Sequence, residues 1–128
     1  MQDQLRELTK AELQIMQLLW QLEKAFVKDL LEKIPEPKPN YNTVSTIIRI
    51  LEQKGFVSHQ AYGNTHQYYP LISQEQYQEF ALKELTKNFF GGSLKSLLSF
   101  FMKKNDLSLE DLNDILNKEQ DFDSKTKK

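Results

Sequence analysis

Apolar residues recur at intervals of three and four through most of the chain, a spacing typical of helices that cover a core. In the first half of the chain, this spacing predicts helices over residues 10–22, 28–34 and 40–55. Thr9 and Glu12 give the first of them a capping-box start, because a hydroxyl and a carboxylate at this separation satisfy free backbone amides. A proline-rich stretch ends the second helix, so we expect three separate helices.

The third predicted helix, NYNTVSTIIRILEQKG, has two unlike faces. One face is an apolar stripe at helical spacing, and the opposite face is short, polar and carries one arginine. Such side chains suit base edges and phosphates in the major groove of DNA, although an ordinary solvated helix face has the same appearance. The polar face consists of Asn42, Ser45, Thr46, Arg49 and Gln53.

Two runs rich in β-branched and aromatic residues follow the third helix. Residues 56–62 and 66–71 flank a Gly-Asn-Thr turn, which predicts a β-hairpin. Three helices and a hairpin make a winged helix, in which the third helix enters the major groove and the hairpin lies along the backbone or minor groove. We expect His66 to contact phosphate or simply to be exposed. Of Tyr68 and Tyr69, which alternate across the strand, one should pack inward and the other should face DNA.

A second helical block begins at Ser73, where another capping-box pattern starts a helix that ends near Phe90. A Gly-Gly pair then interrupts the chain, and further apolar stripes predict helices over residues 93–103 and from Ser108 onward. This block is too small to bury its leucines and phenylalanines alone. It therefore either packs back on the first block or pairs with a second copy, and we favour pairing.

The predicted architecture is mainly α-helical, with an N-terminal winged helix of three helices and a β-hairpin wing. Residues 1–72 are expected to form the DNA-binding domain, residues 73–120 a three-helix dimerisation region, and residues 121–128 a disordered polar tail. The side chains expected in the dimer interface are Tyr77, Phe80, Leu94, Leu97, Leu98, Phe101, Leu112 and Leu116.

Composition limits the remaining chemistry. The net charge of −1 does not favour nucleic acid, so a winged helix used for protein–protein contact is the alternative function. Without cysteine the chain has no disulfide, thiolate metal site or cysteine nucleophile. His59 and His66 are too few for a metal site, and nothing indicates an enzyme or a cofactor. A polar N-terminus and no apolar stretch of ~20 residues indicate a cytoplasmic protein that does not enter membranes.

The chain contains, in order, the segments LTKAELQIMQLLW, NTVSTIIRILEQKGFV, HQYYPLIS, FFGGSLKSLLSFF and DLSLEDLNDIL. Together they resemble the BlaI/MecI/CopY family of bacterial winged-helix repressors, over about residues 8–117. The resemblance implies a homodimeric transcriptional repressor that occupies a dyad operator through the third helix. It places base contacts on Asn42, Thr43, Ser45 and Thr46, and contacts of the helix and wing with the DNA backbone on Arg49, Lys54, His66 and Tyr68.

Three departures from the family pattern bear on mechanism. Arg49 lies one position away from the arginine of the family's usual Thr-Arg-Leu, which leaves the operator sequence open. Because few basic residues lie nearby, we also expect the affinity for DNA to depend only weakly on salt. The chain lacks the cysteine cluster of the copper-responsive members. Penicillinase-type members are cut by a sensor protease at an Asn-Phe bond, whereas the matching stretch here has Ser99, Phe100 and Phe101. Induction by proteolysis therefore stays open.

Overall fold

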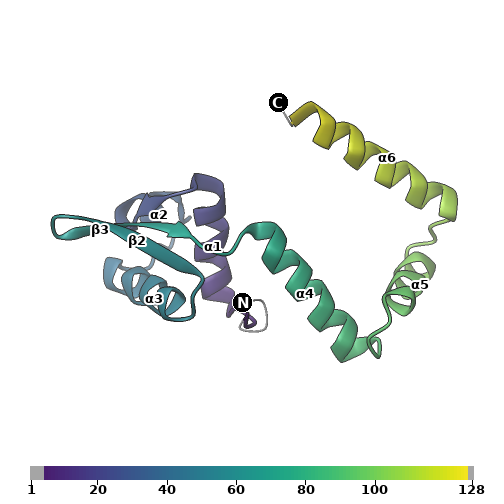
Figure 1. Ribbon diagram of the computed structural model, residues 1–128, viewed down its shortest axis with the longest axis horizontal. Coiled ribbons are helices and arrows are strands. Elements are labelled where there is room, and N and C mark those ends of the chain that lie inside the picture. Colours follow the sequence, from purple (N-terminus) through teal and green to yellow (C-terminus); the bar gives the residue numbers. More distant parts are fainter. Residues whose placement is uncertain (1–4, 127–128) are drawn as a thin grey trace. The chain divides into compact units, whose positions relative to one another are not determined.

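The computed structural model describes residues 5–126, with side chains described up to residue 118 (Figure 1). The described residues form six helices and a small antiparallel sheet, which confirms the expected mainly helical class with a hairpin wing. No helix in this part of the chain is long and apolar enough to cross a membrane. The elements are α1 (Lys10–Leu22), β1 (Ala25–Phe26), α2 (Val27–Lys33), α3 (Tyr41–Gln53), β2 (Val57–Tyr62), β3 (Thr65–Pro70), α4 (Gln74–Phe89), α5 (Leu94–Lys104) and α6 (Leu109–Thr126).

The chain divides into two compact units, Met1–Leu82 and Lys83–Lys128. The first unit extends beyond the predicted boundary at residue 72, because Tyr77 and Phe80 near the start of α4 pack against its core. Helix α4 crosses the division as one continuous helix. The first unit is therefore the winged helix plus the opening turns of the next helix.

The core of the first unit forms where the apolar stripes of α1, α2 and α3 meet the sheet. Helix α1 has the expected bounds and capping box: Thr9 Oγ1 accepts from the Glu12 amide at 3.1 Å, and Glu12 Oε1 accepts from the Thr9 amide at 3.0 Å. Each large apolar side chain taken fully out of water contributes about 1.5–3 kcal/mol. The fully buried side chains of this kind include Met16, Leu19, Leu30, Ile48, Leu51 and Phe56.

The wing is the expected hairpin of β2 and β3, and the structure adds a strand to it. Gly63, with φ of 62°, makes the turn between the two strands. Ala25 and Phe26, which lie between the first two predicted helices, form β1 and pair with Tyr68 and Gln67 of β3. The strand order is β1-β3-β2, so β3 is the central strand.

The second unit contains the end of α4, helix α5 and helix α6. All residues of α5 are described, and none of them is buried. Helix α6 continues to Thr126, and it thus extends into the segment from residue 121 that was expected to be a disordered tail. The tail segment contains no glycine or proline that would stop a helix. Residues 127–128 lie outside the described residues.

Candidate nucleic-acid interface

The outer face of α3 presents polar side chains to solvent, as its sequence pattern predicts. Asn42, Thr43, Thr46 and Arg49 are exposed, and Ser45 is half-buried. On the opposite face, the apolar stripe is buried in the core, so the helix is held from behind while its polar side stays accessible. This is the arrangement that a helix needs to enter a major groove.

The N-terminus of α3 is fixed by Asn40, whose side chain caps the helix. Asn40 Oδ1 accepts a hydrogen bond from the Thr43 amide at 2.9 Å and from the Thr43 hydroxyl at 3.2 Å. An Asn cap of this kind satisfies an amide that has no partner within the helix. The cap therefore defines where the first exposed turn of α3 begins, and it orients the Thr43 hydroxyl.

A groove of about 570 Å³ lies between α3, the start of α2 and the tip of the wing. Lys28 from α2, Arg49 from α3 and His66 from β3 line it, and no described residue of its lining is acidic. Arg49 Nε donates to the Ser45 carbonyl at 3.3 Å, which keeps the guanidinium along its own helix. A groove with basic groups from three elements and no carboxylate suits a phosphate backbone.

Sequence reasoning missed Lys28 as a member of this groove. Its position at the start of the second helix is visible in the sequence, but only the fold brings it to the same groove as Arg49 and His66. A lysine in the first turn of a helix is otherwise unremarkable, and the sequence holds no signal that separates it from other surface lysines.

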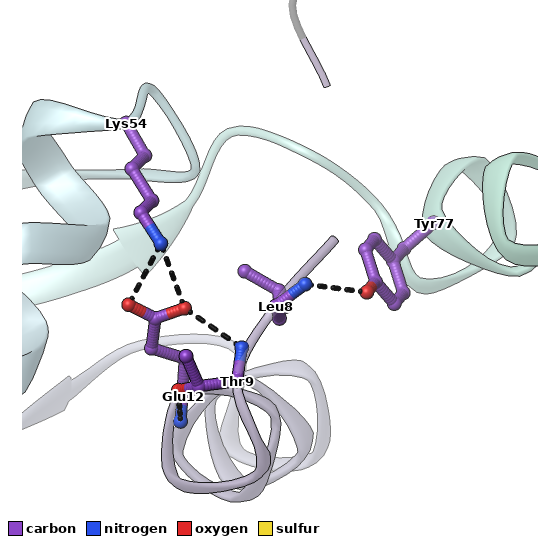
Figure 2. A network of polar contacts seen from close by, with 5 residues as sticks. All are labelled: Leu8, Thr9, Glu12, Lys54 and Tyr77. Carbon is purple, nitrogen blue, oxygen red and sulfur yellow. Dashed lines mark hydrogen bonds and ion pairs between the residues drawn. The ribbon is translucent and has the colours of Figure 1, made fainter. Parts of the chain in front are cut away.

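Lys54 is bound within the fold by Glu12, and its contact with DNA stays a prediction. Its ammonium lies 2.9 Å from both carboxylate oxygens of Glu12, in an ion pair that joins the end of α3 to the start of α1 (Figure 2). Burial raises the pKa of Glu12, but the hydrogen bonds from Lys54 and Thr9 outweigh burial, and the pKa lies below its ordinary value. The charge of Lys54 is thus paired with a carboxylate of the same chain.

Tyr68 is a core residue that also lines the groove, and its contact with the DNA backbone stays a prediction. Its side chain is 4% exposed and belongs to the core, while its neighbour Tyr69 is 38% exposed. Burial is the main cause that raises the pKa of Tyr68. The alternation of the two tyrosines is therefore as expected, with Tyr68 as the inward member because it shares a sheet face with the buried Ala25.

The two histidines of the hairpin stack on one another with ring centroids 4.0 Å apart. His59 Nδ1 lies 2.7 Å from a carboxylate oxygen of Glu52, so His59 ties the wing to α3. His66 is exposed and lines the groove. Among the described residues, no group of three or more potential ligands could hold a metal ion.

The residues predicted for dimerisation fall into two sets. Tyr77 is 8% exposed and Phe80 is half-buried, and both pack on the core of the first unit. Their part in a dimer interface stays a prediction. The others lie on α5 and α6 in the second unit. Of these, Leu97 and Leu112 are half-buried, and the exposed ones are Leu94, Leu98, Phe101 and Leu116. The positions named for cleavage, which are Ser99, Phe100 and Phe101, are all exposed on α5.

Three helices, a hairpin wing, an exposed polar third helix and a basic groove beside it define a winged-helix protein of the DNA-binding class. Comparison with known proteins makes this specific: residues 8–120 match the model of the penicillinase repressor family, and the chain belongs to that family. The resemblance noted from the sequence segments is thereby confirmed.

Relatives in this family come from several bacteria. The methicillin resistance regulatory protein MecI of Staphylococcus aureus (strain N315) is 30% identical over 116 residues, which cover 88% of this chain and 94% of MecI. The penicillinase repressor of Bacillus licheniformis is 24% identical over 110 residues, covering 85% and 86%. The solved DNA-binding domain of the repressor BlaI is 22% identical, with a TM-score of 0.49, over 56% of this chain and 88% of that domain. The named relatives are regulators and repressors, not enzymes.

Proposed function

We propose that this protein is a homodimeric transcriptional repressor that occupies a dyad DNA operator. Helix α3 lies in the major groove, with Asn42, Thr43, Ser45 and Thr46 toward the bases. Lys28, Arg49 and His66 bind phosphates on the side of the wing. Repression follows from occupying a promoter, and it needs neither catalysis nor a cofactor.

The observation that carries the DNA-binding part is the acid-free groove beside the polar face of α3. The protein as a whole has a net charge of −1, so it does not attract DNA through its overall charge. Two basic residues, Lys28 and Arg49, instead meet His66 where α3, α2 and the wing come together, with no carboxylate in the groove lining. Local concentration of this kind supports a specific DNA-facing surface on a nearly neutral protein.

The dimeric part rests on the apolar surface of the second unit. Helix α5 leaves Leu98, Phe100 and Phe101 between 39% and 53% exposed, and α6 leaves Leu116 at 52%. Exposed large apolar side chains in such density mark an interaction surface. A second copy of the same unit covers them with matching residues, and the resulting two-fold symmetry explains why the operator would be a dyad.

The test is selection of duplexes from a random DNA pool with the purified full chain, followed by sequencing. We expect a dyad motif with half-sites separated by about one helical turn or a multiple of it. The matched control is Thr46→Ala, which should lose base preference at one position of each half-site and keep the rest of the motif. Enrichment of no motif above background would refute the proposal and would favour a winged helix that contacts another protein.

Relief of repression by a sensor protease is part of the same proposal. Ser99, Phe100 and Phe101 lie together on α5, where all three are exposed. A cut there would divide the proposed dimer surface and so weaken operator binding. Mass spectrometry of the protein from induced cells should show a fragment that ends within these residues, and full-length protein alone after induction would point to another inducing step.

A further inference from the structure

The groove between α3, the start of α2 and the tip of the wing has an aromatic side as well as a basic one. Phe26, which is half-buried, and Tyr41, which is 51% exposed, line it together with its basic side chains. Its volume of about 570 Å³ falls within the range of about 300–1,000 Å³ that is usual for sites of small molecules. All of its lining residues belong to the first unit, so the groove is complete within one chain.

One polar group in this groove lacks a partner. The side chain of Tyr68 is 4% exposed, and no hydrogen bond among the described residues involves its hydroxyl. In the same part of the chain, every fully buried side-chain nitrogen or oxygen has a partner, so solvent must reach this hydroxyl. Because Tyr68 lines the groove, the groove is the route by which solvent reaches it. A ligand in the groove can therefore take the hydrogen bond that the protein leaves unused.

Packing of the Tyr68 ring fixes where this hydroxyl lies. The ring centroid is 5.6 Å from that of His59 and 6.1 Å from that of His66, the two stacked histidines. Burial raises the pKa of Tyr68, so its hydroxyl stays protonated near neutral pH and is able to donate. The charge of Glu52 also raises this pKa, but Glu52 is bound by His59 and is not part of the groove lining.

Two cations stand in the same groove with unused donors. The Nε of Arg49 donates to the Ser45 carbonyl, and the terminal nitrogens of this guanidinium donate to no described residue. The ammonium of Lys28 likewise has no hydrogen-bond or ion-pair partner within the described residues. A guanidinium and a hydroxyl donor together suit the two oxygens of a carboxylate, because hydrogen bonds to an ionised group are the stronger ones.

We infer that this groove binds a small aromatic carboxylate. The carboxylate is held by Arg49, Lys28 and the Tyr68 hydroxyl. The aromatic body packs against the rings of Phe26 and Tyr41, since aromatic rings favour contact with one another.

The bound ligand would occupy the two cations that the proposed function assigns to DNA phosphates. It would therefore exclude DNA from this side of the wing and release the protein from its operator. This exclusion of DNA rests on the proposed function, whereas binding of the ligand does not.

The first test uses the full chain without DNA. The isotope-labelled protein is titrated with indole-3-acetate while two-dimensional NMR spectra record the shifts of its backbone amides. We expect a dissociation constant of about 1 mM or below, the affinity that ordinary ligand efficiency gives a molecule of about 13 non-hydrogen atoms. The amides that shift most should lie on the three elements of the groove, at Lys28, Ser45 and His66.

Two further ligands separate the parts of the site. Indole-3-acetamide has the ring without the charge, and acetate has the charge without the ring. Each should bind at least about tenfold more weakly than indole-3-acetate. Binding of the amide that equals that of the carboxylate would overturn the assignment of an anion site.

Variants test the residues of the site. Lys28→Gln and Tyr68→Phe, which keeps the buried ring and removes only the hydroxyl, should each weaken binding of indole-3-acetate at least about fivefold. The matched control is Lys33→Gln, on the same helix but outside the groove lining, and its dissociation constant should stay within about twofold of that of the wild type. Thermal melting shows whether each variant is folded, and the wild-type amide shifts locate the ligand even if one is not.

The second test adds the selected operator. At about ten times its dissociation constant, indole-3-acetate should lower the affinity for the operator about tenfold through mass action. Sodium acetate at the same concentration controls for ionic strength and should lower the affinity no more than about twofold.

The outcomes separate the inference from the proposed function. If about 10 mM indole-3-acetate shifts no amide, or only amides outside the groove, the inference is overturned and the proposed function stands. If groove amides shift in a protein that selects no DNA motif, the proposed function is refuted and the ligand site stands. If groove amides shift and the operator affinity does not change with indole-3-acetate, the exclusion of DNA is overturned.

Discussion

Arg49 lies on α3 and Lys54 lies at its C-cap, and the two residues, which carry the same charge, are expected to behave differently in DNA binding. Arg49 lines the groove, whereas the ammonium of Lys54 is bound by Glu12. Replacing Arg49 by Gln should therefore reduce the dependence of operator affinity on salt. Removing the charge of Lys54 should leave that dependence unchanged, provided that Glu12 is not left as a buried, unpaired carboxylate.

The magnitude follows from the number of phosphates neutralised. Lys28 and Arg49 in each protomer give about four phosphate contacts per dimer, and the logarithm of affinity should fall with the logarithm of salt with a slope of about −4. Raising NaCl from about 50 to about 200 mM then weakens wild-type binding by about 250-fold. In Arg49→Gln the slope should be about −2 and the same change of salt should weaken binding by about 16-fold.

Fluorescence anisotropy of a labelled operator across a salt series measures both slopes. The matched control is the double variant Lys54→Met with Glu12→Gln, which removes both partners of the ion pair together and avoids leaving one charge buried alone. Its slope should equal that of the wild type. A double variant with a slope near −2, together with an unchanged slope for Arg49→Gln, would show that the assignment of the two residues is reversed.

Three further changes have defined outcomes. Hydrogen bonds from Lys54 and Thr9 outweigh burial and lower the pKa of Glu12 from 4.5, so the stability that Glu12 contributes is present above that pH and is lost as the pH falls below it. The free energy of unfolding of Glu12→Gln, measured in urea, should therefore approach that of the wild type in acid. A difference between the two proteins that is constant at all pH values would contradict the assignment. Asn40→Ala removes the cap of α3 and should lower the free energy of unfolding by about 1 kcal/mol in denaturant titrations, while an unchanged midpoint would show that the cap is unimportant. Phe101→Asp should give a folded monomer in sedimentation, since its ring is 53% exposed in one chain, and a persistent dimer would remove α5 from the interface.

Much of the first unit could be predicted because its signals are local. The bounds of α1, the capping boxes at Thr9 and Ser73, and the hairpin turn at Gly63 each depend on residues close together in sequence. The polar face of α3 was predictable for the same reason, since the period of a helix assigns its faces without knowledge of the rest of the fold.

What could not be predicted depends on contacts between distant residues. Lys54 looks like a free cation at a helix end until the fold places Glu12 beside it. The choice between Tyr68 and Tyr69 as the buried member depends on the pairing of β3 with β1, a strand too short to carry its own pattern. Tyr77 was assigned to the dimer interface because its apolar spacing continues along α4, although it packs on the first unit.

The central position of β3 divides the wing into a supported base and a free tip. Strand β1 pairs with Tyr68 and Gln67, whereas Thr65 and His66 pair with β2 alone. Asn64 and Thr65 are exposed at the tip, away from the buried core. Thr65 Oγ1 donates to the Tyr62 carbonyl at 2.9 Å and so closes the turn, whereas Asn64 should accept substitutions with little change in the free energy of unfolding.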